Sequence, residues 1–157
     1  MLFGCVKDQF YVENNGLTRR TSNSNSLPIN NINGSWIVVY YNNLENHSII
    51  TKNDVDSWKG MDVVLKFADS TFCGQNTTNE VAGHYKLQDS TIKIDVYGGT
   101  KMGQPLWGNM FSDNVYSLKS FKVNDTELRF YYNNHKNCVT LYKLRRGITC
   151  HWTYSKK

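Results

Sequence analysis

The side chains that could carry out chemistry are few and widely spaced. The four histidines include no HExxH or similar close pair from which a zinc hydrolase builds its metal site. Asp54, Asp56 and Asp62 are the main local group of acids, but they lack the terminal Glu of a calcium-binding loop. No nucleophile elbow, phosphate-binding loop or dinucleotide fingerprint occurs. We therefore predict a protein that is not an enzyme and has no catalytic residue, metal site or cofactor.

The four cysteines have no CxxC spacing, which disfavours zinc-ribbon and thioredoxin-type sites. Cys73, Cys138 and Cys150 leave their disulfide pairing open, and without an identifiable His partner Cys73 is predicted to be a core cysteine. Cys5 has a different context, because Leu2-Phe3-Gly4-Cys5 resembles the end of a bacterial lipobox. The prediction is a lipid attached at Cys5, and the alternative is a chance match.

The chain divides by composition near residue 33. From Glu13 to Asn33 it is polar and rich in Asn, Ser and Thr, which is typical of a flexible linker. We expect residues 1–33 to be a lipobox-like start followed by a tether, or an N-terminal tail without a role. Residues 34–157 are expected to form one β-rich domain that ends in a basic C-terminal hairpin.

The positive charge is concentrated at the C-terminal end. The net charge is +5, and residues 136–157 contain six Lys or Arg and no acid. This favours a solvated turn and tail, with a contact to an anionic surface such as membrane headgroups as the alternative. No nucleic acid partner is expected, because no RNA- or DNA-binding motif is present.

Alternating apolar residues predict that most of the domain is β-structure. The 19 asparagines favour turns over helix and strand interiors. Period-two patterns and short apolar runs indicate strands at 36–41, 47–51, 61–68, 71–73, 81–87, 92–96, 121–123, 128–132 and 139–144, with 148–154 completing a hairpin. Gly98 and Gly99 are expected to end the sixth strand.

The helical period occurs in one segment. Apolar residues Trp107, Met110, Phe111, Val115 and Leu118 fall at i, i+3, i+4, i+8 and i+11, which predicts an amphipathic helix over about 108–119. The expected fold is mainly β, a curled antiparallel sheet or open barrel in a single domain, with one principal helix that closes its open side.

Two short motifs carry a family resemblance. Asn79, Gly83 and Tyr85 have the spacing of the META domain signature, and Thr100-Lys101-Met102 resembles its second signature. The META family consists of small domains in bacterial envelope lipoproteins and heat-shock-type secreted proteins. The resemblance covers about residues 34–144, and it implies structural roles for these residues with no catalytic group.

This chain departs from the family pattern at two positions. Relatives often have cysteines immediately before the Asn and two residues after the Met, where Thr78 and Gln104 stand here. A link between those cysteines would therefore be absent. Gly83 in a strand indicates a bulge or a close backbone approach, and Asn79 is expected to hydrogen-bond a neighbouring turn.

The expected function follows from the lipobox-like start, the linker and the family resemblance. We predict a non-enzymatic lipoprotein domain of the bacterial cell envelope that binds an envelope protein or an apolar molecule. The alternative is a secreted, lipocalin-like carrier without an anchor. The many aromatic residues suit either core packing or an apolar pocket, since a small barrel can hold one ligand.

Overall fold

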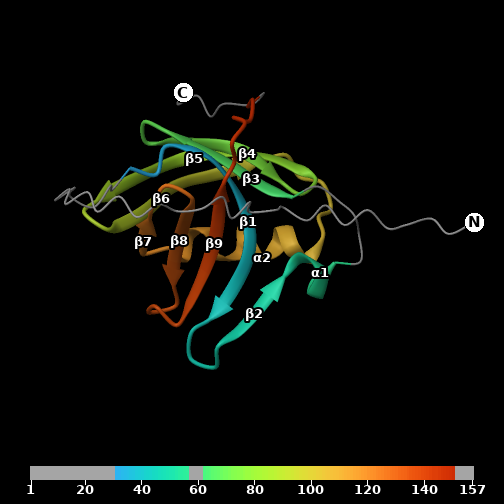
Figure 1. Cartoon of the computed structure of the whole chain (residues 1–157). Helices are drawn as coiled ribbons and strands as arrows, with labels where there is room; N and C mark the ends of the chain where they lie inside the picture. The colour runs from blue at the N-terminus through green and yellow to red at the C-terminus, as the bar shows by residue number, and fades with distance from the viewer. Residues whose placement is uncertain (1–30, 57–61, 151–157) are drawn as a thin grey trace, which may run out of the picture.

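The computed structural model describes residues 31–56 and 62–150, which form one nine-stranded antiparallel sheet curled into a ring (Figure 1). The strands are β1 (Gly34–Asn43), β2 (Ser48–Thr51), β3 (Val63–Ala68), β4 (Thr71–Asn76), β5 (Asn79–Gln88), β6 (Thr91–Gly99), β7 (Ser120–Val123), β8 (Glu127–Tyr132) and β9 (Asn137–Lys143). The predicted fold class is confirmed.

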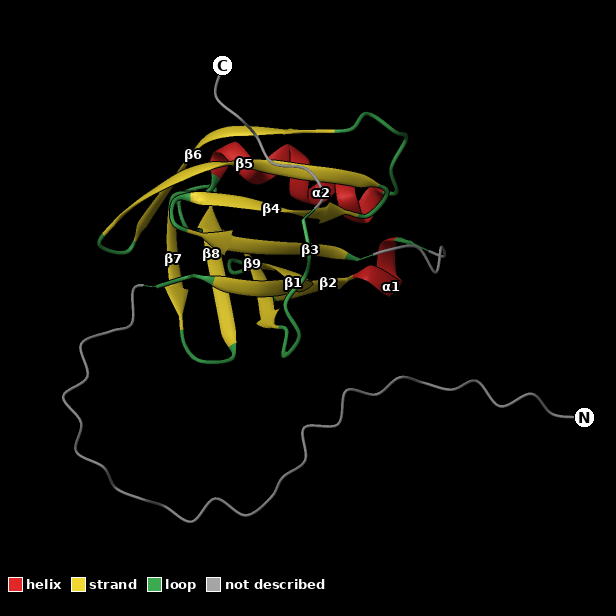
Figure 2. Ribbon diagram, turned by 90° about the horizontal axis from the view of Figure 1, so that it is seen from above, coloured by secondary structure: helices red, strands yellow, loops and turns green. Residues whose placement is uncertain are grey.

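Pairing of the first and last strands closes the ring. The order is β2-β1-β3-β4-β5-β6-β7-β8-β9, and β1 also pairs with β9 from Trp36 to Asn43. The ring is weakest between β6 and β7, which share the single pair Thr91↔Ser120. Figure 2 shows the two groups of strands crossing steeply, with a helix covering one end.

The principal helix is shorter and begins earlier than its apolar spacing predicts. Helix α2 spans Leu106–Asn114, and a 3-10 turn, η1, continues over Val115–Ser117 before the chain becomes extended at Leu118. Pro105 precedes the first helical residue, in an extended conformation that proline adopts readily. The helix lies between β6 and β7 in the chain, as expected. It packs against β3 and β4, and the η1 turn that follows packs against β6.

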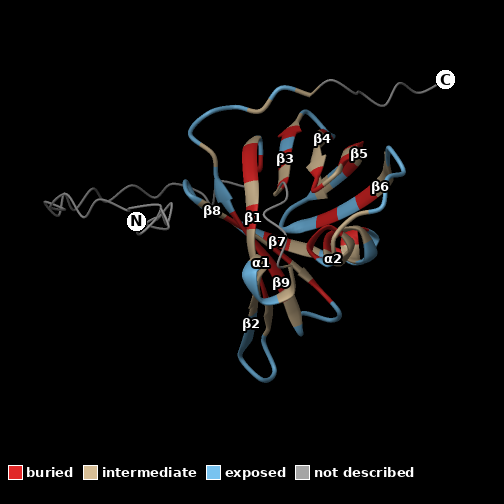
Figure 3. Ribbon diagram, turned by 90° about the vertical axis from the view of Figure 1, so that its right-hand side faces the viewer, coloured by how far each residue is buried: buried red, intermediate tan, exposed pale blue. Residues whose placement is uncertain are grey.

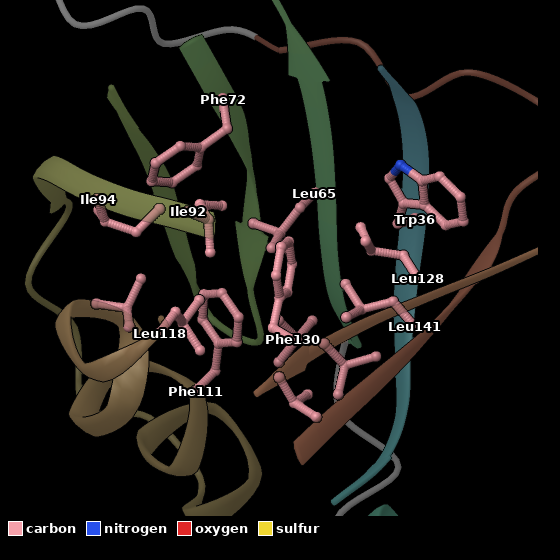
Figure 4. Packing of buried hydrophobic residues seen from close by; sticks show 14 of the residues in the cluster. Trp36, Leu65, Phe72, Ile92, Ile94, Phe111, Leu118, Leu128, Phe130 and Leu141 are labelled. Carbon is pink, nitrogen blue, oxygen red and sulfur yellow. The ribbon is translucent and has the colours of Figure 1, made fainter. Parts of the chain in front are cut away.

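Alternation along the strands divides inner from outer residues. Buried and exposed residues alternate along the first half of β6, as Figure 3 shows. The inner side chains form one core, in which Phe111 and Leu118 point from the helical segment toward Ile94 and Phe130 (Figure 4). Trp36, Leu65 and Phe130 are 0% exposed, so the middle of the ring is filled by side chains.

Three strand boundaries differ from the sequence-based prediction. The strand β6 continues through Gly98 and Gly99, which pair with Ala82 and Val81 of β5. A Cβ atom at Gly99 would collide with the Glu80 carbonyl oxygen, so the glycine permits this pairing rather than ending the strand. Strand β4 extends to Asn76, which leaves only two residues for the turn into β5, and β1 continues to Asn43.

The predicted C-terminal hairpin does not form as expected. Strand β9 ends at Lys143, and residues 144–150 contain no strand. Both sides of β9 are already paired, with β1 and β8, so no edge is left for a returning strand. The rest of the predicted return, 151–154, lies outside the described residues, as do Cys5 and linker residues 13–30.

The short helix α1 (Lys52–Val55) includes the first residues of segment 53–60, whose sequence predicts a loop. It begins with a capping box between Thr51 and Asp54. The folded region begins slightly before the predicted boundary, because Ile32 is fully buried and its carbonyl accepts a hydrogen bond from the Trp36 indole.

Candidate functional site: an exposed tyrosine-rich sheet face

The two motifs that carry the family resemblance meet in the folded chain. The Asn79 amide oxygen accepts hydrogen bonds from the Met102 backbone N–H at 2.7 Å and from the Thr100 hydroxyl at 3.1 Å. Its amide nitrogen donates to the Met102 carbonyl. Asn79 therefore fastens the segment between β6 and α2 to the start of β5, which is a structural role.

Thr78 and Gln104, at the positions of the cysteines in the META signature, belong to the same contact. The Thr78 hydroxyl donates to the Gly103 carbonyl at 3.0 Å, and Gln104 accepts a hydrogen bond from Asn79 at 3.0 Å. Met102 itself is 62% exposed and takes part through its backbone. Polar contacts therefore hold the two motifs together.

Gly83 and Tyr85 lie on the central strand β5. A Cβ atom at Gly83 would overlap the Val96 carbonyl oxygen and the Phe72 ring, so the backbones approach closely there. The register of β5 and β6 shifts immediately beyond, between His84 and Tyr85. Tyr85 is buried against Phe67, and burial raises the pKa of its hydroxyl. These positions shape the sheet and hold no reactive group.

The acids considered for calcium each have a separate partner. Asp54 accepts hydrogen bonds from Thr51, which lower its pKa. Asp56 accepts from the Trp107 backbone N–H, and Asp62 pairs with Lys52 at 2.8 Å. Within residues 31–56 and 62–150, no group of three or more His, Cys, Asp or Glu side chains could hold a metal ion.

The cysteines show a pairing that the sequence left open. Cys73 and Cys150 form a disulfide, with their Cα atoms 5.9 Å apart. The prediction that Cys73 is a core cysteine is therefore wrong: it lies half-buried on β4, where the C-terminal segment reaches it. Cys138 is the free cysteine of the described region, and burial raises the pKa of its thiol.

One contact between potentially reactive groups escaped the sequence reasoning. The Ser120 hydroxyl lies 2.6 Å from Nε2 of His135, across the exposed end of β7 and the turn after β8. The two residues are 15 apart in sequence, and only strand pairing brings them together. No Asp or Glu of the described chain hydrogen-bonds to His135, so the pair is not part of a Ser-His-acid triad.

The most distinctive surface is the outer face of β1, β9 and β8. Strand register places Tyr40, Thr140 and Arg129 in one cross-strand row, because Thr140 pairs with both other residues. The neighbouring row contains Asn42, Cys138 and Tyr131. Since residues in a row lie on the same side of a sheet, all six side chains share the outer face.

Large side chains on this face surround two small buried ones. Thr140 and Cys138 are 0% and 1% exposed, although they lie on the outside of the ring. The covering residues include Tyr40 and Tyr142, whose rings meet edge to face with centroids 6.3 Å apart. We call the surface formed by Tyr40, Tyr131, Tyr142 and Arg129 the tyrosine face.

Charges and aliphatic residues border the tyrosine face. Arg129 pairs with Glu127 at 2.6 Å, and Lys122 lies 6.0 Å from the centroid of the Tyr131 ring. Tyr142 is 45% exposed, and Ile49, opposite Asn42 on β2, is 59% exposed. Tyrosine and arginine with an apolar neighbour are the residue types that dominate binding at protein interfaces.

Two small surface depressions accompany the ring. One, of about 210 Å³, lies between the outer surface of β3, β4 and β5 and residues 148–150. The other, of about 240 Å³, borders the tyrosine face at Lys122, Glu127 and Arg129. Both are small compared with sites that enclose a drug-sized ligand, for which roughly 300–1,000 Å³ is usual.

Comparison with known proteins finds solved structures of similar fold. No family model matches this chain, and no curated protein matches it. It is similar to a Burkholderia xenovorans protein solved by NMR, with a TM-score of 0.58 and 16% identity over 73% of this chain and 83% of that one. A DUF4847 family protein from Bacteroides vulgatus has a TM-score of 0.52 and 19% identity, over 72% and 94% of the two chains.

These similarities are fold similarities. The META resemblance stays a prediction that rests on Asn79, Gly83, Tyr85, Thr100 and Met102. No helix in the described part of the chain has both the length and the hydrophobicity required to span a membrane.

Proposed function

We propose that this chain is a non-enzymatic protein of the bacterial cell envelope, attached through a lipid at Cys5, whose ring domain binds a partner protein through the tyrosine face. The Cys73–Cys150 disulfide carries the proposal. Such bonds persist in the periplasm and outside the cell and are rare in reducing cytosol. The two solved structures compared above come from bacteria, in keeping with a bacterial setting.

The tyrosine face supports binding as the mode of action. Thr140 and Cys138 are already covered, so Tyr142 and its neighbours can contact a partner without exposing the core. Rigid aromatic side chains lose little conformational entropy when a partner covers them. In addition, the centre of the ring is filled by core side chains, which favours an external over an internal binding surface.

The first test concerns compartment and anchor. Bacterial cells that express the protein from its own gene are fractionated, and thiols are trapped with a maleimide of known mass before and after reduction. We expect the protein in the envelope fraction. After reduction, two additional thiols should react with the maleimide, those of Cys73 and Cys150. An alkyne-labelled fatty acid should label wild type and Cys138→Ala but not Cys5→Ala. Cytosolic protein with all thiols free would contradict export.

The second test concerns the binding face. A photoreactive residue replaces Tyr142, and a matched one replaces Leu106, which is similarly exposed but lies on α2. We expect a discrete cross-linked protein at position 142 only, and competition by wild type but not by Tyr40→Ala. Equal cross-linking at both positions would remove the support for this face.

The runner-up is a secreted, lipocalin-like carrier. It is favoured by two buried polar atoms without a hydrogen-bond partner in the described structure, the Tyr41 hydroxyl and the Trp107 indole N–H. Their rings meet edge to face at 5.0 Å, and a small ligand with a hydrogen-bond acceptor would satisfy them. A fatty acid that raises the melting temperature of the wild type would support this alternative.

A further inference from the structure

We infer that a basic cluster formed by Lys66, Lys143, Arg145 and Arg146 is a contact surface for anionic phospholipid headgroups. All four residues are exposed. Among the residues that the structure describes, they have no acid within 4.0 Å, whereas Lys52, Lys86, Lys93, Arg129 and Lys136 each have one. The cluster therefore combines positive charges that the protein itself leaves unneutralised.

Ser35 holds the loop that carries the two arginines of the cluster. The Leu144 N–H donates to the Ser35 carbonyl at 2.8 Å, and the Ile148 N–H donates to the Ser35 hydroxyl at 3.1 Å. The three residues 145–147 thus form a loop whose two ends are fastened to the same residue. Arg145 and Arg146 project from this loop and not from a free tail.

Strand pairing places the two lysines at the same end of the ring. Lys66 of β3 is the cross-strand partner of Ser35, and Lys143 is the partner of Trp36. Lys143 also lies 5.3 Å from the centroid of the Trp36 ring, which holds its stem against the protein. The four cations therefore come from two strands and one loop at one end of the ring. Lys66 shares the outer side of the sheet with Ser35, whereas Lys143 shares the inner side with Trp36.

The disulfide fixes the far end of the same segment. Cys150 is bonded to Cys73, and Cys73 is the cross-strand partner of Lys66. The chain consequently runs from Lys143 over Ser35 to the strand beside Lys66, and is covalently held there. This arrangement preserves the cluster in an oxidising compartment.

The neighbouring acids reduce the charge but do not cancel it. Asp69 follows β3, Asp125 lies in the turn before β8, and Glu80 borders the depression beneath residues 148–150. The four cations exceed these three acids by one charge, and Arg145 and Arg146 are both exposed on the loop. Lys156 and Lys157 add two positive charges further along the sequence.

The position of the tether makes a membrane the appropriate anionic partner. The described chain begins at Asn31, three residues before Gly34, where an added Cβ would lie 3.3 Å from the Lys143 Cε. The N-terminal end of the described chain therefore lies near Lys143. Here the inference rests on the proposed function: if Cys5 is acylated, the tether raises the local concentration of headgroups, and a weak contact suffices to orient the domain.

The test uses the full chain with Cys5→Ala, so that headgroup binding is measured without an acyl chain. Flotation is performed with vesicles of equal parts phosphatidylglycerol and phosphatidylcholine, and with phosphatidylcholine alone. We expect binding to the anionic vesicles only, weakened by salt. One cation near such a surface strengthens binding about 5-fold, so Arg145→Gln with Arg146→Gln should weaken it roughly 30-fold.

Two variants with the same change in net charge serve as controls. Lys101→Gln with Lys119→Gln removes exposed cations elsewhere and should change binding less than 2-fold. Lys156→Gln with Lys157→Gln removes the tail charges. It should weaken binding to anionic vesicles clearly less than the arginine substitutions do. Thermal melts confirm that each variant is folded.

Several outcomes would overturn the inference. The inference is wrong if the protein does not bind anionic vesicles, or if it binds phosphatidylcholine vesicles equally well. It is also wrong if either control variant loses as much binding as the arginine pair. Saturable one-site binding of free glycerol 3-phosphate would indicate a discrete phosphate site instead of a headgroup surface. Because Cys5 is replaced throughout, failure here leaves the envelope and partner-binding tests of the proposed function unaffected.

Discussion

Removal of the Cys73–Cys150 disulfide gives the most direct test of the structure. The bond joins residues 77 apart. For a loop of this length, the chain-entropy model assigns the bond about 4.5 kcal/mol of stability, through restriction of the unfolded chain. The folded protein offsets part of this, because residues 144–150 form no strand and gain freedom once the bond is broken. We expect a net loss of about 2 to 4 kcal/mol.

The assay is urea unfolding followed by tryptophan fluorescence, since Trp36 and Trp107 are fully buried. Oxidised and reduced wild type are compared with Cys73→Ser/Cys150→Ser. At an m-value of about 2 kcal/mol per molar, the midpoint should fall by roughly 1 to 2 M urea upon reduction. The double variant should resemble the reduced protein.

The double variant also provides the control. Cys138 remains in it, so a further shift upon reduction would mean that a different pair is bonded. A difference below about 1 kcal/mol between oxidised and reduced wild type would refute the reasoning, because it would mean that the long loop is not closed by a covalent bond in the folded protein.

Three other substitutions test the packing. Gly83→Val should destabilise the domain by about 3 kcal/mol or more, whereas Gly103→Val should be nearly neutral, since a Cβ there meets nothing within 4 Å; similar melting temperatures would contradict the close approach. Leu65→Ala should cost about 2 to 5 kcal/mol in urea unfolding if the core is filled, and a much smaller loss would favour a ligand pocket. Burial raises the pKa of Tyr41 well above its usual value, so stability from its neutral hydroxyl is complete below about pH 10 and is lost as pH rises toward the folded-state pKa. As pH rises above about 10, Tyr41→Phe should lose less stability than the wild type, and at pH 7 it should be at least as stable as the wild type. Tyr97→Phe, which removes hydrogen bonds, should be less stable than the wild type at pH 7. If Tyr41→Phe and the wild type lost equal stability at high pH, the burial of the Tyr41 hydroxyl would be contradicted.

The sequence was most informative where apolar residues recur at the spacing of a strand or a helix. Ile92 and Ile94 alternate with polar residues, and the structure confirms a strand with one buried face. The helical spacing of Trp107 and Phe111 likewise located the main helix, because side chains on one side of a helix must share a buried surface.

Boundaries were less predictable, because they depend on neighbours. Gly98 and Gly99 have the local signature of a strand end, yet β5 supplies partners that keep both in the sheet. The prediction of a C-terminal hairpin is wrong for a related reason. Strand β9 is paired on both sides, and the chain that follows it is held by Ser35 and Cys73.

The amino-acid sequence by itself determined the strand-rich composition, the single main helix, the absence of familiar catalytic motifs and the basic C-terminal end, since each follows from local pattern. Only the tertiary structure decided that Cys73 pairs with Cys150 and that Tyr40 and Tyr142 meet on one outer face. These contacts join residues between 77 and 102 positions apart. Their proximity depends on ring closure and strand register, which no local pattern records.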